Sequence, residues 1–342
     1  MDTRLPEDAR EARMLAEAVL ADFDGETTSA LLDASRNERL ESALTDAGLA
    51  ELMRSAGEET EQPTVMTAVL TMALAGSLFA RPFLGDWVLG AQLAKLSDRE
   101  LHAGDGSRIG LTANLRDVAT GSDTKMVVFD AHGGSEVLCV DRTDDGTRST
   151  IRAYAIPSKC EEIHHDLTRT CTMVDGLTDE LSTWSADIDS EEYRRWHTRA
   201  LTMIAADTVG VMEGALKRAL AYVEVREQFG RPIGTFQAIQ HWAAEMAVSV
   251  EASRAVSIRA AWSCDELDWR EADYWARAAK AYASMSAVSV AEGCLQFFGG
   301  TGMTWDAVPH LYLRRSAFDA AILDGWSEHA LAMGDELLGE TR

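Results

Sequence analysis

Apolar residues recur at helical spacing through the first part of the chain. The stretches 6–23 and 36–53 place apolar side chains three or four positions apart, and the first of them opens with an acidic turn, which favours a helix start. Residues 64–79 are apolar on nearly every side, which predicts a buried helix. Pro82 and Gly85 follow, and we expect them to break the chain before another apolar segment. The pattern therefore predicts helices up to about residue 104.

The pattern changes between residues 105 and 182. Short β-branched segments alternate there with turn sequences such as HGG and DDG, and they read SRIGLTA, TKMVVFDA, SEVLCVD, RSTIRAYAI and RTCTMVD. Strands of this length and spacing predict a small β-sheet or partial barrel. No glycine-rich phosphate loop follows any of them, so neither a Rossmann nor a Walker site is supported.

Long amphipathic helices return from residue 183 onward. An apolar stripe at helical spacing consists of Val209, Met212, Leu216, Leu220 and Val223. Thr235 is placed to cap the next helix, a third helix covers about 269–297, and a fourth follows Pro309. These segments predict an antiparallel four-helix bundle. The predicted fold is mainly α with a small β domain, divided into residues 1–104, 105–182 and 183–342.

Charge and composition narrow the function classes. The 342-residue chain carries a formal net charge of −24, which argues against nucleic acid but leaves room for a small phosphate-bearing ligand bound locally. No apolar run reaches the length of a membrane span, and the acidic N-terminus lacks a signal-peptide pattern, so we expect a cytoplasmic protein. The five cysteines have no CxxC spacing, which favours buried thiols over a disulfide framework.

Histidine placement does not predict a metal site. His164, His165 and Asp166 are adjacent in sequence, and neighbouring residues of a strand point to opposite faces, so they converge poorly on one ion. His310 and His329 have no suitably spaced partner. We expect no bound metal.

Two motifs of the C-terminal region resemble the signatures of a known family. YVEVREQFGRPIGTFQAIQHWAAEMA and CLQFFGGTGMTWDAVPHLYLRRS are similar to the two C-terminal signatures of the acyl-CoA dehydrogenase superfamily, and LTDAGLAEL resembles part of its first domain. The resemblance implies an N-terminal helical domain, a reduced β middle domain and a C-terminal four-helix bundle. It also implies an FAD cofactor and an acyl-CoA or related thioester substrate in lipid or steroid metabolism.

The resemblance implies specific cofactor contacts. Arg226 would reach the pyrophosphate of a neighbouring subunit's FAD, because a guanidinium grips phosphate bidentately. The implied cofactor-binding residues are Arg226, Gln228, Phe229, Gln237, Gln296, Gly299, Gly300 and Gly302. Taken singly, the glycine run is also a common helix end and the arginine turn a common helix connection.

The catalytic base is the open question. The family's reaction is α,β-dehydrogenation, in which a carboxylate removes a proton from Cα. The resemblance places Asp324 at one known base position and Ala200 at the other, while Asp207, further along the same helix, is more consistent with structural hydrogen bonding. Three hypotheses stay open: one subunit of a heteromer whose longer partner carries the catalytic Glu, a self-sufficient homo-oligomer using Asp324, and a non-catalytic scaffold.

Overall fold

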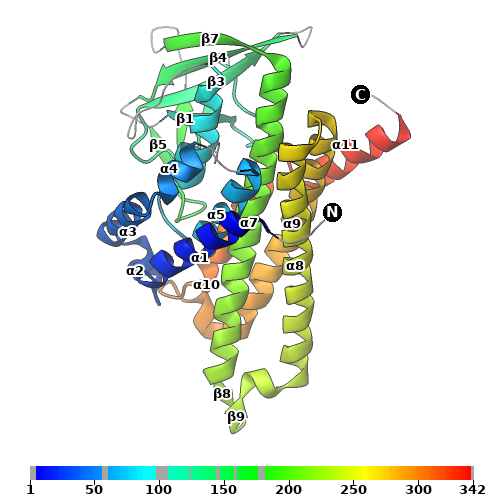
Figure 1. Ribbon diagram of the computed structural model, residues 1–342. Helices are drawn as coiled ribbons and strands as arrows, with labels where there is room; N and C mark the ends of the chain where they lie inside the picture. The colour runs from blue at the N-terminus through cyan, green and yellow to red at the C-terminus, as the bar shows by residue number, and fades with distance from the viewer. Residues whose placement is uncertain are drawn as a thin grey trace.

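Figure 1 shows a long helical bundle with a β-sheet at one end and smaller helices along one side. The computed structural model describes residues 5–55, 61–97, 107–121, 123, 125–143, 147–157, 160–175 and 182–339. Helix α7 runs from the sheet at the top of the view to the hairpin β8–β9 at the bottom, so it connects the two ends of the molecule.

The N-terminal region is helical, as predicted. Its elements are α1 (Glu7–Ala21), α2 (Thr28–Leu32), α3 (Ala34–Asp46), α4 (Leu49–Arg54), α5 (Pro63–Gly76), the π-helical segment η1 (Phe83–Gly90) and α6 (Ala91–Lys95). Almost every residue of α5 is buried, which confirms the prediction from its apolar surface. The predicted break at Gly85 is wrong, since Gly85 lies inside η1. A side chain there would collide with Asp130, whose Oδ2 accepts a 2.8 Å hydrogen bond from the Gly85 N–H, so close approach explains this glycine.

The sheet contains all five predicted strands and two more. Its strands are β1 (Ser107–Thr112), β2 (Lys125–Val128), β3 (Glu136–Arg142), β4 (Arg148–Ala155), β5 (Glu161–Ile163), β6 (Cys171–Asp175) and β7 (Ser182–Asp189), in the order β5-β6-β2-β1-β3-β4-β7. We placed residues 183–189 in the helical region, but they form β7, which pairs antiparallel with β4. Polar residues alternate along β7 with Trp184, Ala186 and Ile188, which is the alternation of a strand covered on one face.

The C-terminal region is a helical bundle. It consists of α7 (Ser190–Val225), α8 (Gln237–Glu266), α9 (Trp269–Phe298), α10 (Pro309–Ala321) and a further short helix, α11 (Trp326–Leu338). Two details differ from the predictions. Leu220 of the apolar stripe is 38% exposed, and Thr235 does not cap α8, because it lies in the 3₁₀ turn Ile233–Thr235 and its hydroxyl donates to the carbonyl of Pro232.

Glycines join the N-terminal helices to the bundle. A Cβ on Gly210 of α7 would lie 2.2 Å from the carbonyl oxygen of Met72 in α5, and one on Gly214 would lie 2.1 Å from that of Gly76. The backbones of α5 and α7 therefore touch, which only residues without side chains allow.

Within the described residues, no helix is both long and apolar enough to cross a membrane. Cys139, Cys171 and Cys294 are buried free thiols, as expected, whereas Cys160 and Cys264 are only half-buried.

Candidate functional site

The two C-terminal motifs meet at the lower end of the bundle. Tyr222, one turn before the end of α7, stacks on Phe298 at the end of α9 with ring centroids 4.3 Å apart. Its hydroxyl also lies 3.5 Å from the hydroxyl of Thr301 in the glycine turn. This contact brings the arginine turn and the glycine turn, far apart in sequence, to one end of the molecule, which we call the bundle tip (residues 222–240 and 294–303).

The arginine turn is a tight hairpin that projects from the bundle tip. Arg226 ends α7, and the strands β8 (Glu227–Gln228) and β9 (Arg231–Pro232) flank the two turn residues. Phe229 and Gly230 both have positive φ, 54° and 78°, which is the geometry of a tight two-residue hairpin turn. The ring of Phe229 is 93% exposed, and Arg226 and Gln228 are exposed as well.

The glycine turn provides open backbone beside the hairpin. Gly299 has a φ of 59°, and no atom lies within 4 Å of the position that a Cβ would take at Gly299 or Gly300. Gln296 and Gln237, the first residue of α8, are exposed at the same end. Gly302 differs, since a Cβ there would lie 2.8 Å from Cβ of Phe298. The missing side chain at Gly302 thus has a packing reason.

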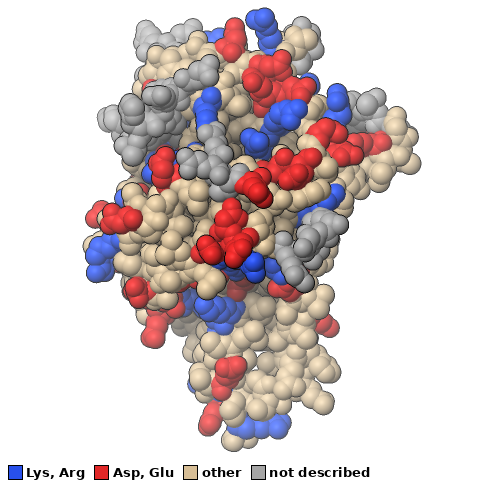
Figure 2. All heavy atoms as spheres, viewed as in Figure 1, with Lys and Arg blue, Asp and Glu red and all other residues tan. Residues whose placement is uncertain are grey.

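These groups have the chemistry that half of a dinucleotide site requires. The side chain of Arg226 makes no ion pair with any described residue, and the same end of the bundle also carries an exposed aromatic ring, amide side chains and open glycine backbone. A guanidinium and backbone N–H groups suit phosphate, and an exposed ring suits an adenine face. In Figure 2, acidic side chains gather over the upper and middle parts of this face, whereas the lower end of the bundle is mostly uncharged.

Asp324 lies elsewhere, in the turn between α10 and α11. Its carboxyl group is 36% exposed, with Nε of Arg116 at 3.8 Å. Partial burial raises the pKa of Asp324 above its ordinary value, and Arg116 acts against that shift. Lys280 of α9 donates to the backbone carbonyl of Asp324. Lys280 and Gln296 share α9 and, at 1.5 Å per residue, stand about 24 Å apart, so the structure does not bring Asp324 to the bundle tip.

The other base position and its neighbour are structural. Ala200 is buried in α7 and carries no ionisable group. Asp207 is fully buried and accepts two hydrogen bonds from Arg315, at 2.8 and 3.2 Å, and one of 2.5 Å from Arg169. Asp207 therefore connects the bundle to the segment before β6 through hydrogen bonds. This is the structural role that the sequence analysis expected for it.

Asp207 belongs to a buried charged cluster that the sequence analysis did not find. Burial raises the pKa of Asp319, and the neighbouring Asp207 raises it further. Burial also acts to raise the pKa of Asp207, but Arg169 and Arg315 outweigh it and lower that pKa below its ordinary range. Within this pair, Asp207 is thus the carboxyl group whose pKa is lowered, and Asp319 the one whose pKa is raised. Arg315 lies among the buried residues of α10, which include Leu311, Tyr312 and Phe318. A charged residue on this apolar helix face is the sequence signal that could have revealed the buried cluster.

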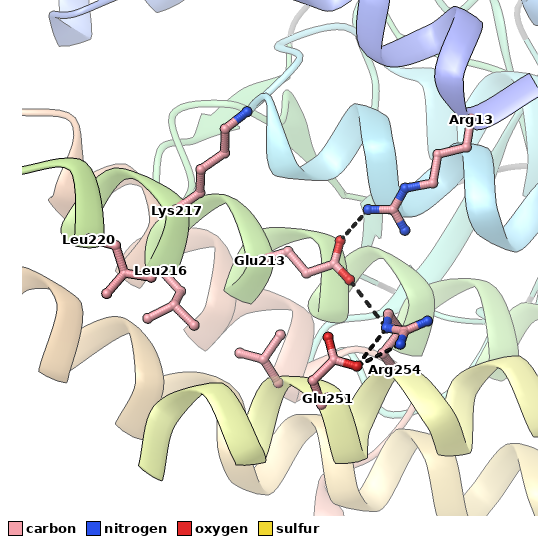
Figure 3. A pocket seen from close by; sticks show the side chains of 8 residues that line it. Arg13, Glu213, Leu216, Lys217, Leu220, Glu251 and Arg254 are labelled. Atoms are coloured by element: carbon pink, nitrogen blue, oxygen red, sulfur yellow. Dashed lines mark hydrogen bonds and ion pairs between the residues drawn. The ribbon is translucent and has the colours of Figure 1, made fainter. Parts of the chain in front are cut away.

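A groove between α1, α7 and α8 lies apart from both regions. Its cavity measures about 560 Å³ and is lined by Arg13, Glu213, Leu216, Lys217, Leu220, Val250, Glu251 and Arg254. Figure 3 shows Glu213 between Arg13 and Arg254, which also pairs with Glu251, whereas Lys217 points away from them. None of the predicted site residues lines this groove.

The histidines are scattered. His164 and His165 are exposed beyond the end of β5, and Asp166 is buried and accepts hydrogen bonds from the backbone and hydroxyl of Thr168. Across the ranges that the structure describes, no group of three or more His, Cys, Asp or Glu side chains is arranged to hold a metal ion.

Sequence comparison identifies the bundle. Residues 197–336 match the family model of the acyl-CoA dehydrogenase C-terminal domain. The chain is 38% identical to the acyl-CoA dehydrogenase FadE34 of Mycobacterium tuberculosis over 37% of its own length, but that match spans only 18% of FadE34. A longer match, with the acyl-CoA dehydrogenase IpdE2 of Mycolicibacterium smegmatis, is 28% identical and covers 75% of this chain and 73% of IpdE2.

Solved structures share the fold over the full length. The steroid acyl-CoA dehydrogenase Tcur3481-Tcur3483 superposes with a TM-score of 0.78 at 21% identity, covering 97% of this chain and 98% of that one. The ChsE4-ChsE5 complex from Mycobacterium tuberculosis gives 0.72 at 21% identity, covering all of both chains. A glutaryl-CoA dehydrogenase from Mycobacterium smegmatis, solved in complex with FADH2, gives 0.64 at 16% identity and covers 99% of this chain and 96% of that one. Residues 197–336 are therefore similar to the acyl-CoA dehydrogenase C-terminal domain, and the chain as a whole shares the fold of these dehydrogenase structures.

Proposed function

We propose that this chain is one subunit of an FAD-dependent dehydrogenase that introduces an α,β double bond into an acyl thioester. The observation that carries the proposal is the bundle tip, where Arg226 and Phe229 stand exposed without charged partners from the described residues, and where the backbone of Gly299 and Gly300 is open. A half-site of this kind is complete only when another chain brings the rest of the cofactor to it. FAD, when bound, would supply the hydride acceptor.

The chain's own residues divide this work. Arg226 would hold the pyrophosphate, and Phe229 would cover the adenine ring. The open backbone at Gly299 and Gly300 would let N–H groups approach the cofactor. Gln228, Gln237 and Gln296 would add hydrogen bonds from amide groups. The division of the chain into residues 1–104, 105–182 and 183–342 belongs to this proposal, with the small sheet as the reduced middle domain.

Exposed apolar side chains near the bundle tip support a partner subunit. Val225, Phe229, Trp242 and Val248 are 76%, 93%, 39% and 68% exposed. An interface would remove this apolar surface from water. We propose a longer homologous subunit that carries the catalytic Glu. Two of the structures with this fold, ChsE4-ChsE5 and Tcur3481-Tcur3483, bear the names of two components, which is consistent with a heteromer.

A second candidate is a homo-oligomer that uses Asp324 as its base. The observation in its favour is that burial raises the pKa of Asp324, because a general base works best with a pKa near the operating pH. Asp is one methylene shorter than Glu, and Arg116 lies beside it, so we rank this candidate second.

Flavin content and mass together test the proposal. The chain would be purified alone and together with a longer homologous subunit, and visible flavin absorbance and light scattering would be measured for each. We expect flavin and a stable oligomer only in the pair. Flavin in the lone chain would favour the homo-oligomer, and flavin in neither sample would leave a scaffold role.

A further inference from the structure

The turn that carries Asp324 has an unusual backbone. Leu323 and Asp324 are consecutive and both adopt left-handed φ values, 53° and 71°. This conformation is strained for a residue with a side chain. Leu323 is only 1% exposed, so the turn is part of the core and not a loose loop. Strained backbone of this kind persists only where its surroundings hold it.

Three hydrogen bonds from three separate elements hold this turn. The ammonium of Lys280 in α9 donates to the carbonyl of Asp324 at 3.1 Å. The Leu323 N–H donates to the carbonyl of Leu115, between β1 and β2, at 2.7 Å. His329 of α11 contacts the carbonyl of Leu323 through Nε2 at 2.8 Å. The conformation of the turn is therefore set by tertiary contacts rather than by its own sequence.

Lys280 contributes more than one of these bonds. It is completely buried and also donates to the carbonyls of Asp319 and Ala320 at 3.1 and 3.2 Å and to the hydroxyl of Ser284 at 2.9 Å. The last carbonyls of a helix lack partners inside the helix, and a cation is favourable beside them. The ammonium thus joins the end of α10 to the carbonyl of Asp324 beyond it.

His329 completes the hold as a neutral imidazole. Burial lowers its pKa to about 4, so the ring carries a single proton at neutral pH. The contact with a carbonyl assigns that proton to Nε2, which donates to Leu323. Among the residues that the structure describes, Nδ1 of His329 is buried without a hydrogen-bond partner.

We propose that Lys280 is a positioning residue, which together with His329 fixes the strained turn so that the carboxyl group of Asp324 stands beside Arg116. The inference rests on the second candidate of the proposed function, in which Asp324 of this turn is the base. Lys280 acts through the backbone of Asp324 and does not itself take part in proton transfer.

The electrostatic surroundings of Asp324 give the proposal a second consequence. Its charged neighbours are Arg116 and Asp117 from the segment between β1 and β2, Glu328 from α11 and Lys280 from α9. Arg116 and Lys280 favour the carboxylate, while Glu328 and Asp117 disfavour it. Loss of the Lys280 charge would therefore raise the pKa of the Asp324 carboxyl group.

The decisive variant is Lys280→Met, which keeps the length of the side chain and removes its donors. Lys217→Met is the matched control, because Lys217 is an exposed lysine on α7. Amide hydrogen exchange at residues 322–326 should become at least about tenfold faster in Lys280→Met, with α7 amides unchanged and with no change in the control. The Asp324 carboxyl group, followed by carbon-13 NMR, should titrate at higher pH. An equal rise of exchange throughout α7 and α9, or none at the turn, would overturn the proposal.

His329→Leu provides an independent test if Lys280→Met does not fold. It removes the donor to Leu323 and should raise exchange at 322–326 by a few fold, again without change in α7. Unchanged exchange in this variant would contradict the proposal that His329 and Lys280 together fix the turn. The exchange and NMR measurements need no flavin, so they separate failure of this inference from failure of the proposed function.

Discussion

The bundle tip and the Asp324 turn share helix α9 but are built in opposite ways. At the bundle tip, Phe229 adopts a left-handed φ with its ring almost fully in solvent, and Arg226 has no ion pair with the described residues. At the turn, Leu323 and Asp324 also adopt left-handed φ, but three elements hold them and one of the two is buried. The polar groups of the bundle tip are exposed and open to a ligand, whereas the backbone groups of the turn already make hydrogen bonds within the protein.

This difference suggests how the two regions depend on other chains. A surface with unpaired donors and exposed apolar side chains gains stability only when something binds it. A turn that its own core holds is pre-organised before any ligand arrives. We therefore expect substitutions at the bundle tip to alter cofactor binding but not the stability of the fold. Substitutions around the turn should alter stability but not cofactor binding.

A matched pair of arginine variants would compare the exposed bundle tip with the buried charged cluster of Asp207. Arg315→Met leaves Asp207 with Arg169 alone in a fully buried site, and loss of one partner of a buried ion pair typically costs about 3–5 kcal/mol of unfolding free energy. Arg226→Met removes an exposed guanidinium, so the unfolding free energy should stay nearly constant while flavin retention falls. Urea denaturation and flavin absorbance after gel filtration would measure both. Equal destabilisation by the two variants would refute the contrast.

The pH dependence of stability sharpens the description of the turn. Burial lowers the pKa of Lys280 from 10.5 to about 8, so the unfolded chain binds more protons than the folded chain between these values. The unfolding free energy should therefore rise with pH across this window, by on the order of 3 kcal/mol from this group.

Lys280→Met should lack that rise. Urea denaturation at pH 7, 8, 9 and 10 would show the difference between the two proteins, because the other titrating groups are common to both. Parallel pH profiles would mean that Lys280 keeps an ordinary pKa in the folded state.

Asp324→Asn should have the smallest effect. If a partner subunit supplies the base, the dehydrogenation rate of the assembled enzyme should change less than about threefold, because the amide keeps the size of the side chain and general-base loss costs about 10²–10⁴-fold only where the group is the base. Steady-state kinetics at equal flavin content would test this, with Glu328→Gln as the control beside Arg116. A loss above about 100-fold would make Asp324 the base.

Local patterns predicted most of the secondary structure. The all-apolar α5, the five predicted strands and the long helices α7, α8 and α9 follow from periodicity, because burial on one face or on all faces leaves a regular trace in the sequence. The prediction was wrong where tertiary contact decides. Gly85 does not break the helix but allows close approach to Asp130. Residues 183–189 pair with β4 and do not begin a helix.

The sequence by itself determined the motifs of the bundle tip, since the arginine turn and the glycine turn are contiguous stretches with recognisable residue types. Only the tertiary structure decided that Tyr222 and Phe298 stack and bring the two motifs together, that Arg315 meets Asp207, and that Lys280 reaches the turn at Asp324. The physical reason is burial. A lone Lys or Arg on an apolar helix face is costly in the core unless carbonyls or carboxylates from distant segments meet it, and no local pattern specifies those partners.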